Sequence, residues 1–212
     1  MKTETYAIGL ALTARYPQLL PLHSLLNAAV ELLCECHKRD GLILVCGNGG
    51  SAADAAHITG ELLKGFRLAR QPSATQLSAL QRNLEPAKLA EKMQQGVRAI
   101  NLCESSAVLS AISNDLGAEL VYAQQVFALG RPGDVLIGIS TSGNAVNVVH
   151  ALQTARSVGL HTLGLTGSNP GRMDSYCDLL FKVPETETYK IQELHLPIYH
   201  ALCAMTETEI FS

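Results

Sequence analysis

The sequence predicts an α/β fold, a three-layer sandwich in which helices cover both faces of a five-stranded parallel sheet. Five short apolar runs have the length of strands, and helical patterns alternate with them along the chain. Hydrophobic residues make up 47% of the 212 residues and aromatic residues only 5%, which favours Ala-, Leu- and Val-rich helices packed on strands. We therefore expect residues 1–212 to form a single domain that begins with helices over residues 1–40.

The elements follow from the spacing of apolar residues. Apolar positions in Tyr6–Arg39 recur at helical spacing and are interrupted at Pro17 and Pro21, which predicts two helices. Gly41 ends the second helix, and the unbroken apolar run 42–46 is typical of a strand buried on both faces. The other strands are expected at 99–103, 134–139, 161–165 and 178–183. The other helices are expected at about 52–64, 106–113, 118–129, 145–158 and 190–210.

Two features depart from this regular alternation. Residues 70–98 add a segment with a helix-like pattern between the first crossover helix and the second strand. We expect an inserted helical segment there. Pro197 lies within the last predicted helix, and because proline removes one backbone hydrogen bond, we expect a kink or break at that point.

Composition excludes several classes of partner. A formal charge of −3 and a pI near 6.1 give no basic footprint for nucleic acid or for an anionic membrane. No run approaches 18 apolar residues, and the N-terminus lacks the apolar core of a signal peptide. The six cysteines form no CxxC pair, so we expect free thiols and a cytoplasmic protein.

Two strand-to-helix turns have the composition of an anion site. Residues 47–51 read Gly-Asn-Gly-Gly-Ser and residues 140–144 read Ser-Thr-Ser-Gly-Asn, each directly before a predicted helix. Small residues let the backbone approach a ligand, and a helix N-terminus offers free N–H donors. Either turn alone is more often a local helix cap. Because both lie at the carboxyl edge of one sheet, they predict together a neutral cradle for a phosphomonoester.

The first turn also satisfies a dinucleotide fingerprint, through Gly47, Gly49 and Ala52. That fingerprint requires an acidic residue about 20 positions further on, at the end of the next strand. The nearest candidate there, Glu104, lies far beyond that distance. The spacing therefore argues against NAD.

Polar residues on two predicted helices could carry chemistry. His57 and Glu61 are four residues apart, so their side chains share one helix face and could bind a metal or relay a proton. Such a pair is more often a solvated ion pair. The last helix carries Gln192, Glu193, His195 and His200 among apolar residues. We expect Glu193 and His195 to be surface residues or to have their hydrogen bonds satisfied on the helix.

These residues, taken in order, resemble a known family. The segments that carry the resemblance are 46–57 with Glu61, 114–115, 133–144, 165–167, and 191–195 with His200. Together they are similar to the phosphoheptose (sedoheptulose-7-phosphate) isomerases, which belong to the sugar-isomerase or SIS-domain group. The resemblance covers most of the chain.

The resemblance implies an activity and a site. It implies aldose–ketose isomerisation of sedoheptulose 7-phosphate to D-glycero-D-manno-heptose 7-phosphate through an enediol, in a homotetramer with sites at subunit interfaces. Glu61 would be the base and His200 the acid. The implied substrate contacts are Asn48, Gly49, Gly50, Ser51, Asn114, Asp115, Ser140, Thr141, Ser142 and Gln192. The implied Zn²⁺ ligands are His57, Glu61, Gln192 and His200.

Two alternatives stay open at this point. One is a non-catalytic SIS protein that binds a sugar phosphate for regulation, although retention of the implied acid–base and metal residues favours an enzyme. The other is an isomerase of a different sugar phosphate, which the inserted segment and Tyr189 make credible.

Overall fold

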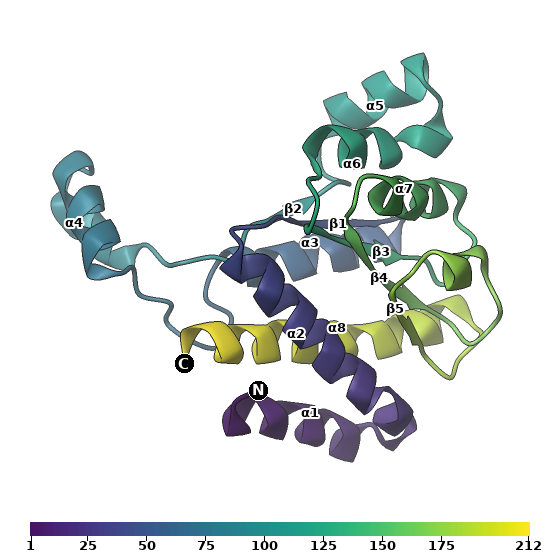
Figure 1. Cartoon of the computed structure of the whole chain (residues 1–212), viewed down its shortest axis with the longest axis horizontal. Coiled ribbons are helices and arrows are strands. Elements are labelled where there is room, and N and C mark those ends of the chain that lie inside the picture. Colours follow the sequence, from purple (N-terminus) through teal and green to yellow (C-terminus); the bar gives the residue numbers. More distant parts are fainter.

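A computed structural model describes residues 1–212 of the protein. A five-stranded parallel sheet lies at the centre of the fold (Figure 1). Its strand order is β2-β1-β3-β4-β5. All residues of β1 and β3 are buried, because these strands lie inside the sheet and are covered on both faces. The strands are β1 (Ile43–Gly47), β2 (Ala99–Asn101), β3 (Val135–Ile139), β4 (His161–Thr166) and β5 (Leu179–Lys182).

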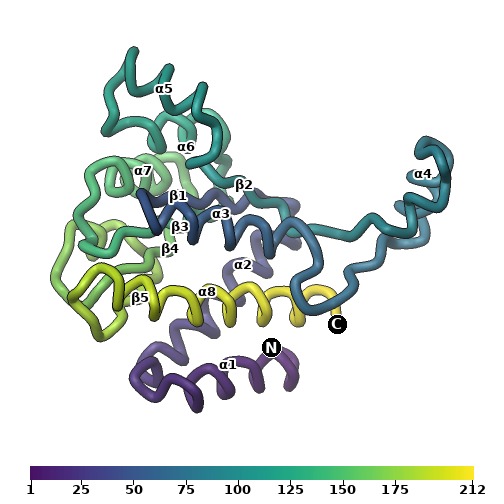
Figure 2. The backbone as a smooth tube through the Cα atoms, turned by 180° about the vertical axis from the view of Figure 1, so that it is seen from behind, coloured from purple at the N-terminus to yellow at the C-terminus, as the bar shows by residue number.

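Helices cover both faces of this sheet, so the predicted three-layer sandwich is confirmed (Figures 1 and 2). Side chains alternate along β1: Ile43 and Val45 join a core cluster with α2, α3 and α8, whereas Leu44 and Cys46 join a second cluster with α6 and α7. Helix α1 packs outside α8 and α2 on the first side. The α-helices are α1 (Thr3–Arg15), α2 (His23–Lys38), α3 (Gly50–Leu63), α4 (Ala74–Asn83), α5 (Ser106–Asp115), α6 (Ala123–Leu129), α7 (Val146–Ser157) and α8 (Thr188–Phe211). The short 3-10 helices are η1 (Pro17–Leu22), η2 (Ala87–Lys92), η3 (Ala118–Leu120) and η4 (Arg172–Ser175).

Two expectations about helices are wrong in detail. The expected helix over 118–129 is divided into η3 and α6, and the interruption brings Val121 and Tyr122 into the core of the second cluster. The expected break at Pro197 does not occur, because α8 is one helix from Thr188 to Phe211. Pro197 and most residues that follow it are buried, so tertiary packing outweighs the one lost hydrogen bond.

Residues 70–98 form an arm that extends away from the sheet (Figures 1 and 2). It contains α4 and η2, which pack on each other. Helix α4 begins at a capping box between Ser73 and Gln76 and contains no buried residue. At the base of the arm, Arg70 is buried against the body of the protein.

The N-terminal helical stretch Pro17–Lys38 is long and apolar enough to cross a membrane by length and composition, with a mean hydropathy of 1.3. In this fold its apolar residues pack inside the protein. Leu26, Val30 and Leu33 are almost fully buried in the first core cluster. The stretch is therefore accounted for as a helix of the core.

Candidate functional site

The two hydroxyl- and glycine-rich turns meet at the carboxyl edge of the sheet, as the alternation of strands and helices predicts. β1 and β3 are neighbours in register, with Gly47 opposite Ile139, so the turns that follow them lie side by side. Between them lies a cavity of about 340 Å³. Its lining comprises Asn48, Gly49, Gly50, Ser51, Ile139, Ser140, Thr141, Ser142, Ala145, Thr188 and Gln192.

Two glycines explain the composition of the first turn. Gly49 has a φ of 55°, a left-handed conformation that glycine adopts without strain. A Cβ atom on Gly50 would collide with the side-chain amide of Gln192, which reaches over from α8. The turn therefore requires small residues both for its own conformation and for the approach of α8.

The second turn uses two of its hydroxyls locally. Ser140 Oγ accepts the backbone N–H of Ala145 at 3.3 Å, and Ser142 Oγ accepts that of Asn144 at 3.2 Å. Thr141 lines the cavity, and its hydroxyl donates no hydrogen bond within the chain. None of the lining residues is charged. A phosphate in this cavity would therefore be held by hydroxyl, amide and backbone donors at the start of α3 and α7.

Sequence reasoning missed two residues that hold the first turn. Asn147 of α7 exchanges two hydrogen bonds with Asn48, at 2.9 and 3.0 Å. The Tyr122 hydroxyl lies 2.6 Å from the carbonyl oxygen of Gly47 and 3.1 Å from Asn48 Oδ1. Neither residue belongs to a motif, and each is far from the turn in sequence, so only the fold reveals them.

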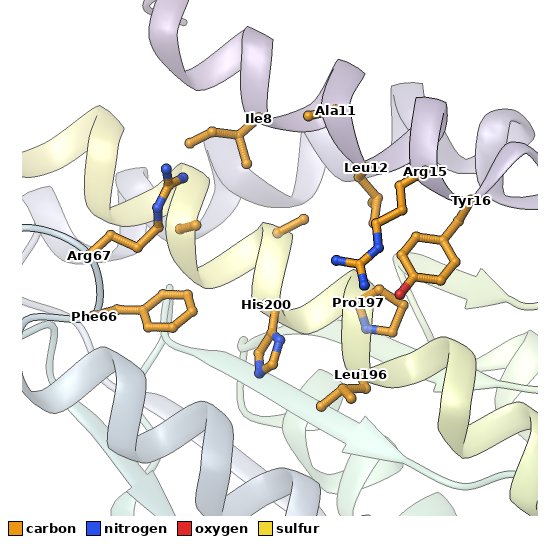
Figure 3. A pocket seen from close by; sticks show the side chains of 12 residues that line it. Ile8, Ala11, Leu12, Arg15, Tyr16, Phe66, Arg67, Leu196, Pro197 and His200 are labelled. Carbon is orange, nitrogen blue, oxygen red and sulfur yellow. The ribbon is translucent and has the colours of Figure 1, made fainter.

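A second group of polar residues lies where α3 and α8 run side by side. His57 Nε2 is 3.2 Å from Glu61 Oε1 and 3.3 Å from His200 Nε2. His200 faces a groove of about 380 Å³ between α1 and α8, into which Arg15 and Arg67 also project (Figure 3). Burial and the neighbouring His57 lower the pKa of His200 below its ordinary value, against the opposing effect of Glu61. The predicted base and acid are thus brought together through His57.

The other side of the His57 ring contacts a tyrosine. Tyr199 Oη lies 3.2 Å from His57 Nδ1 and 3.1 Å from Asp54 Oδ1. Burial raises the pKa of Asp54, whereas the hydrogen bond from Tyr199 opposes that shift. Burial, and the nearby charge of Asp54, raise the pKa of Tyr199 far above that of a free phenol.

The chemistry of these donors fits zinc in part. Two ligands bonded to Zn²⁺ at about 2.0–2.1 Å in a tetrahedral site lie about 3.3 Å apart. His57 has that separation from Glu61 and from His200. Within one chain, however, no three His, Cys, Asp or Glu side chains converge on a common point. Gln192 lines the cavity between the two turns, about two turns of α8 away from His200.

The remaining predicted contacts lie elsewhere. Asn114 and Asp115 are at the exposed end of α5, where the Asn114 side chain donates to Asp115 at 2.7 Å. Neither residue lines the cavity between the two turns. Their role in substrate binding stays a prediction. The expectation for His195 is wrong: the residue is fully buried in α8, and both ring nitrogens lack a hydrogen-bond partner.

Comparison with known proteins identifies close relatives. Residues 21–114 and 84–167 match the SIS domain family. The chain is 41% identical to phosphoheptose isomerase of Roseiflexus sp. (strain RS-1), over 87% of this chain and 81% of the relative. It is 42% identical to phosphoheptose isomerase 1 of Campylobacter jejuni, over 84% and 82%. The solved phosphoheptose isomerase from Neisseria gonorrhoeae superposes with a TM-score of 0.73 at 34% identity, over 96% of this chain and 95% of that one.

Proposed function

Because the chain belongs to the phosphoheptose isomerase family of SIS-domain proteins, we propose that it interconverts sedoheptulose 7-phosphate and D-glycero-D-manno-heptose 7-phosphate. The observation that supports this most is the joint placement of two groups on α3 and α8. Both helices reach the uncharged cavity at one end, through Gly50 and Gln192, and carry Glu61 and His200 further along. A phosphate cradle and an acid–base pair are what a sugar-phosphate isomerase needs.

The reaction transfers a proton between two neighbouring carbons of the open-chain sugar. Glu61 takes the proton from C1 of the ketose, and His200, as the acid, donates a proton to the C2 carbonyl oxygen. The resulting cis-enediol loses the proton of its C1 oxygen and is reprotonated at C2, which gives the aldose. Zinc, when bound, would polarise the sugar oxygens as a Lewis acid. His57, Glu61, Gln192 and His200, supplied by more than one subunit, would hold it.

The position of Gln192 supports a shared site. Since α8 is unbroken, Gln192 and His200 are about 12 Å apart along its axis. Ligands of one zinc ion lie within about 4 Å of one another. Gln192 and His200 would therefore meet at one ion more easily when they come from different copies of the chain, and we include in the proposal a homotetramer in which sites form between subunits.

The proposal includes a cytoplasmic location. All six cysteines are free, and four of them are buried. Free buried thiols are typical of proteins that fold in a reducing compartment.

A time course of sedoheptulose 7-phosphate conversion, followed by NMR with zinc and again after chelation, tests the activity. General acid–base catalysis is worth about 10²–10⁴-fold, so Glu61→Gln and His200→Ala should each lower turnover by that order. His161→Ala, an exposed histidine at the start of β4, is the matched control and should retain wild-type turnover.

Two results would contradict the proposal. Tight binding of the sugar phosphate without conversion would indicate a non-catalytic regulator. Conversion of another sugar phosphate in place of sedoheptulose 7-phosphate would indicate an isomerase of different specificity.

A further inference from the structure

The carbonyl oxygen of Gly47, where the first turn begins, is held by two side chains in place of a neighbouring strand. Two residues earlier on β1, the carbonyl of Val45 accepts the backbone N–H of Leu102 at 2.9 Å, on the β2 side. Carbonyls two residues apart on a strand point the same way, so that of Gly47 also faces this side, where β2 has already ended. There the Tyr122 hydroxyl donates to it at 2.6 Å and the Cys103 thiol at 3.2 Å.

The Tyr122 hydroxyl is committed to this carbonyl. Tyr122 lies directly before α6 in the second core cluster and is only 5% exposed. A phenol has a single proton to donate. Asn48 Oδ1, the other acceptor near the hydroxyl, is more distant at 3.1 Å and already accepts from the Asn147 side chain. The phenol proton therefore goes to Gly47.

The peptide bond between Gly47 and Asn48 carries this orientation across the turn. The bond is trans, so its C=O and N–H groups point in opposite directions. With the carbonyl on the β2 side, the Asn48 N–H faces the β3 side, where the second turn and the cavity lie. Neither this N–H nor that of Gly49 has an acceptor within the chain.

We propose that Tyr122, assisted by Cys103, is a positioning residue that aims the Asn48 N–H at the phosphate of the bound sugar. Unpaired backbone N–H groups in a turn beside a helix N-terminus are donors for an anion. If the Gly47 carbonyl were released, the peptide could rotate, and the apparent affinity would fall with the fraction of molecules that present the donor. That the cavity holds a phosphate rests on the proposed function.

Binding of inorganic phosphate to the metal-free, full-length protein, followed by ³¹P NMR, measures this role without turnover. Tyr122→Phe keeps the buried ring and removes the donor. The net contribution of one hydrogen bond corresponds to a factor of about 2–12 in an equilibrium, so phosphate affinity should fall by about that factor. Tyr176→Phe is the matched control, because the Tyr176 ring packs against the same core cluster but lies outside the turn. It should leave the affinity unchanged.

The kinetic constants and the thiol give two further readouts. Because the phosphate is held equally before and during the reaction, Tyr122→Phe should raise KM for sedoheptulose 7-phosphate by the same factor and leave kcat unchanged. Cys103→Ser retains a donor to the carbonyl and should bind phosphate as the wild type does. The double variant of Tyr122→Phe with Cys103→Ala leaves the carbonyl with neither donor and should bind phosphate more weakly than Tyr122→Phe alone.

The outcomes separate this role from the proposed activity. Unchanged phosphate affinity in Tyr122→Phe, even with a lower Tm, would overturn the inference, as would an equal loss in Tyr176→Phe or a wild type that binds no phosphate. A protein whose phosphate affinity falls as expected in Tyr122→Phe, but which converts no sedoheptulose 7-phosphate, would support the positioning role and contradict the proposed activity.

Discussion

The buried ion pair between Arg70 and Glu207 should be the most sensitive point of the fold outside the core clusters. Both side chains are fully buried, and Arg70 Nε lies 2.8 Å from Glu207 Oε1. The carboxylate also accepts the backbone N–H groups of residues 66–68, at 2.7 to 3.2 Å. The guanidinium donates to the carbonyl oxygens of Leu62 and Glu61, at 2.6 and 2.8 Å, and so caps the last turn of α3.

Arg70→Met retains most of the buried stem but leaves the carboxylate without a counter-charge. Removing one partner of a buried pair costs about 3–5 kcal/mol. At about 2–4 °C per kcal/mol for a chain of this size, Tm should fall by about 6–20 °C at fixed protein concentration. Arg156→Met is the control, because Arg156 pairs with Asp178 at 4.0 Å while both are nearly half exposed; that change should cost about 0–1 kcal/mol.

The pH dependence gives a second arm of the same test. Burial alone raises the pKa of Glu207, but the N–H groups of Phe66 and Arg67 and the Arg70 guanidinium together lower it below its ordinary value. A lowered carboxyl pKa contributes stability above the unfolded value, near 4.5, which is lost as pH falls through the folded value. Without Arg70 the folded pKa of Glu207 rises, so Arg70→Met should lose less stability than the wild type as pH falls below about 4.5. Thermal melts in which Arg70→Met is no less stable than Arg156→Met would show that the buried pair does not stabilise the fold.

Two further predictions concern α8 and the cavity. Burial lowers the pKa of His195 to about 4. As pH falls from about 6.5 to 4, the unfolded chain therefore binds a proton at this histidine that the folded chain does not bind. The free energy of unfolding should drop by about 3 kcal/mol over that window. Denaturant titrations should show this drop in the wild type and a smaller one in His195→Leu; equal drops would contradict it. Gly50→Ala places a Cβ against the Gln192 amide and should raise KM for the sugar phosphate at least tenfold, whereas Gly60→Ala, with open space around its Cβ, should leave KM unchanged.

The sheet was predictable because its signals are local. Each buried strand is a short apolar run, and each of the two turns carries its glycines and hydroxyls within five residues of sequence. Parallel strands place these turns at one edge, so their meeting around a cavity followed from topology. The pairing of His57 with Glu61 followed from helical spacing.

The partners that hold the site were not predictable, because they are distant in sequence. Arg70 and Glu207 are separated by 137 positions, and Asp54 and Tyr199 by 145. Nothing in the local pattern of either segment pairs them. Pro197 shows the opposite error: a reliable local rule predicted a break, but the burial of the residues around it keeps α8 continuous.

In the proposed reaction Glu61 moves a proton between C1 and C2 of sedoheptulose 7-phosphate, and incubation of the protein with this sugar in D₂O tests that step. We expect an aldoheptose 7-phosphate to appear, carrying deuterium at C2 wherever the abstracted proton exchanges with solvent, and Glu61→Gln to form it at least 10²-fold more slowly. An unchanged ketose in the presence of the wild-type protein and zinc, or an equal rate in Glu61→Gln, would contradict it.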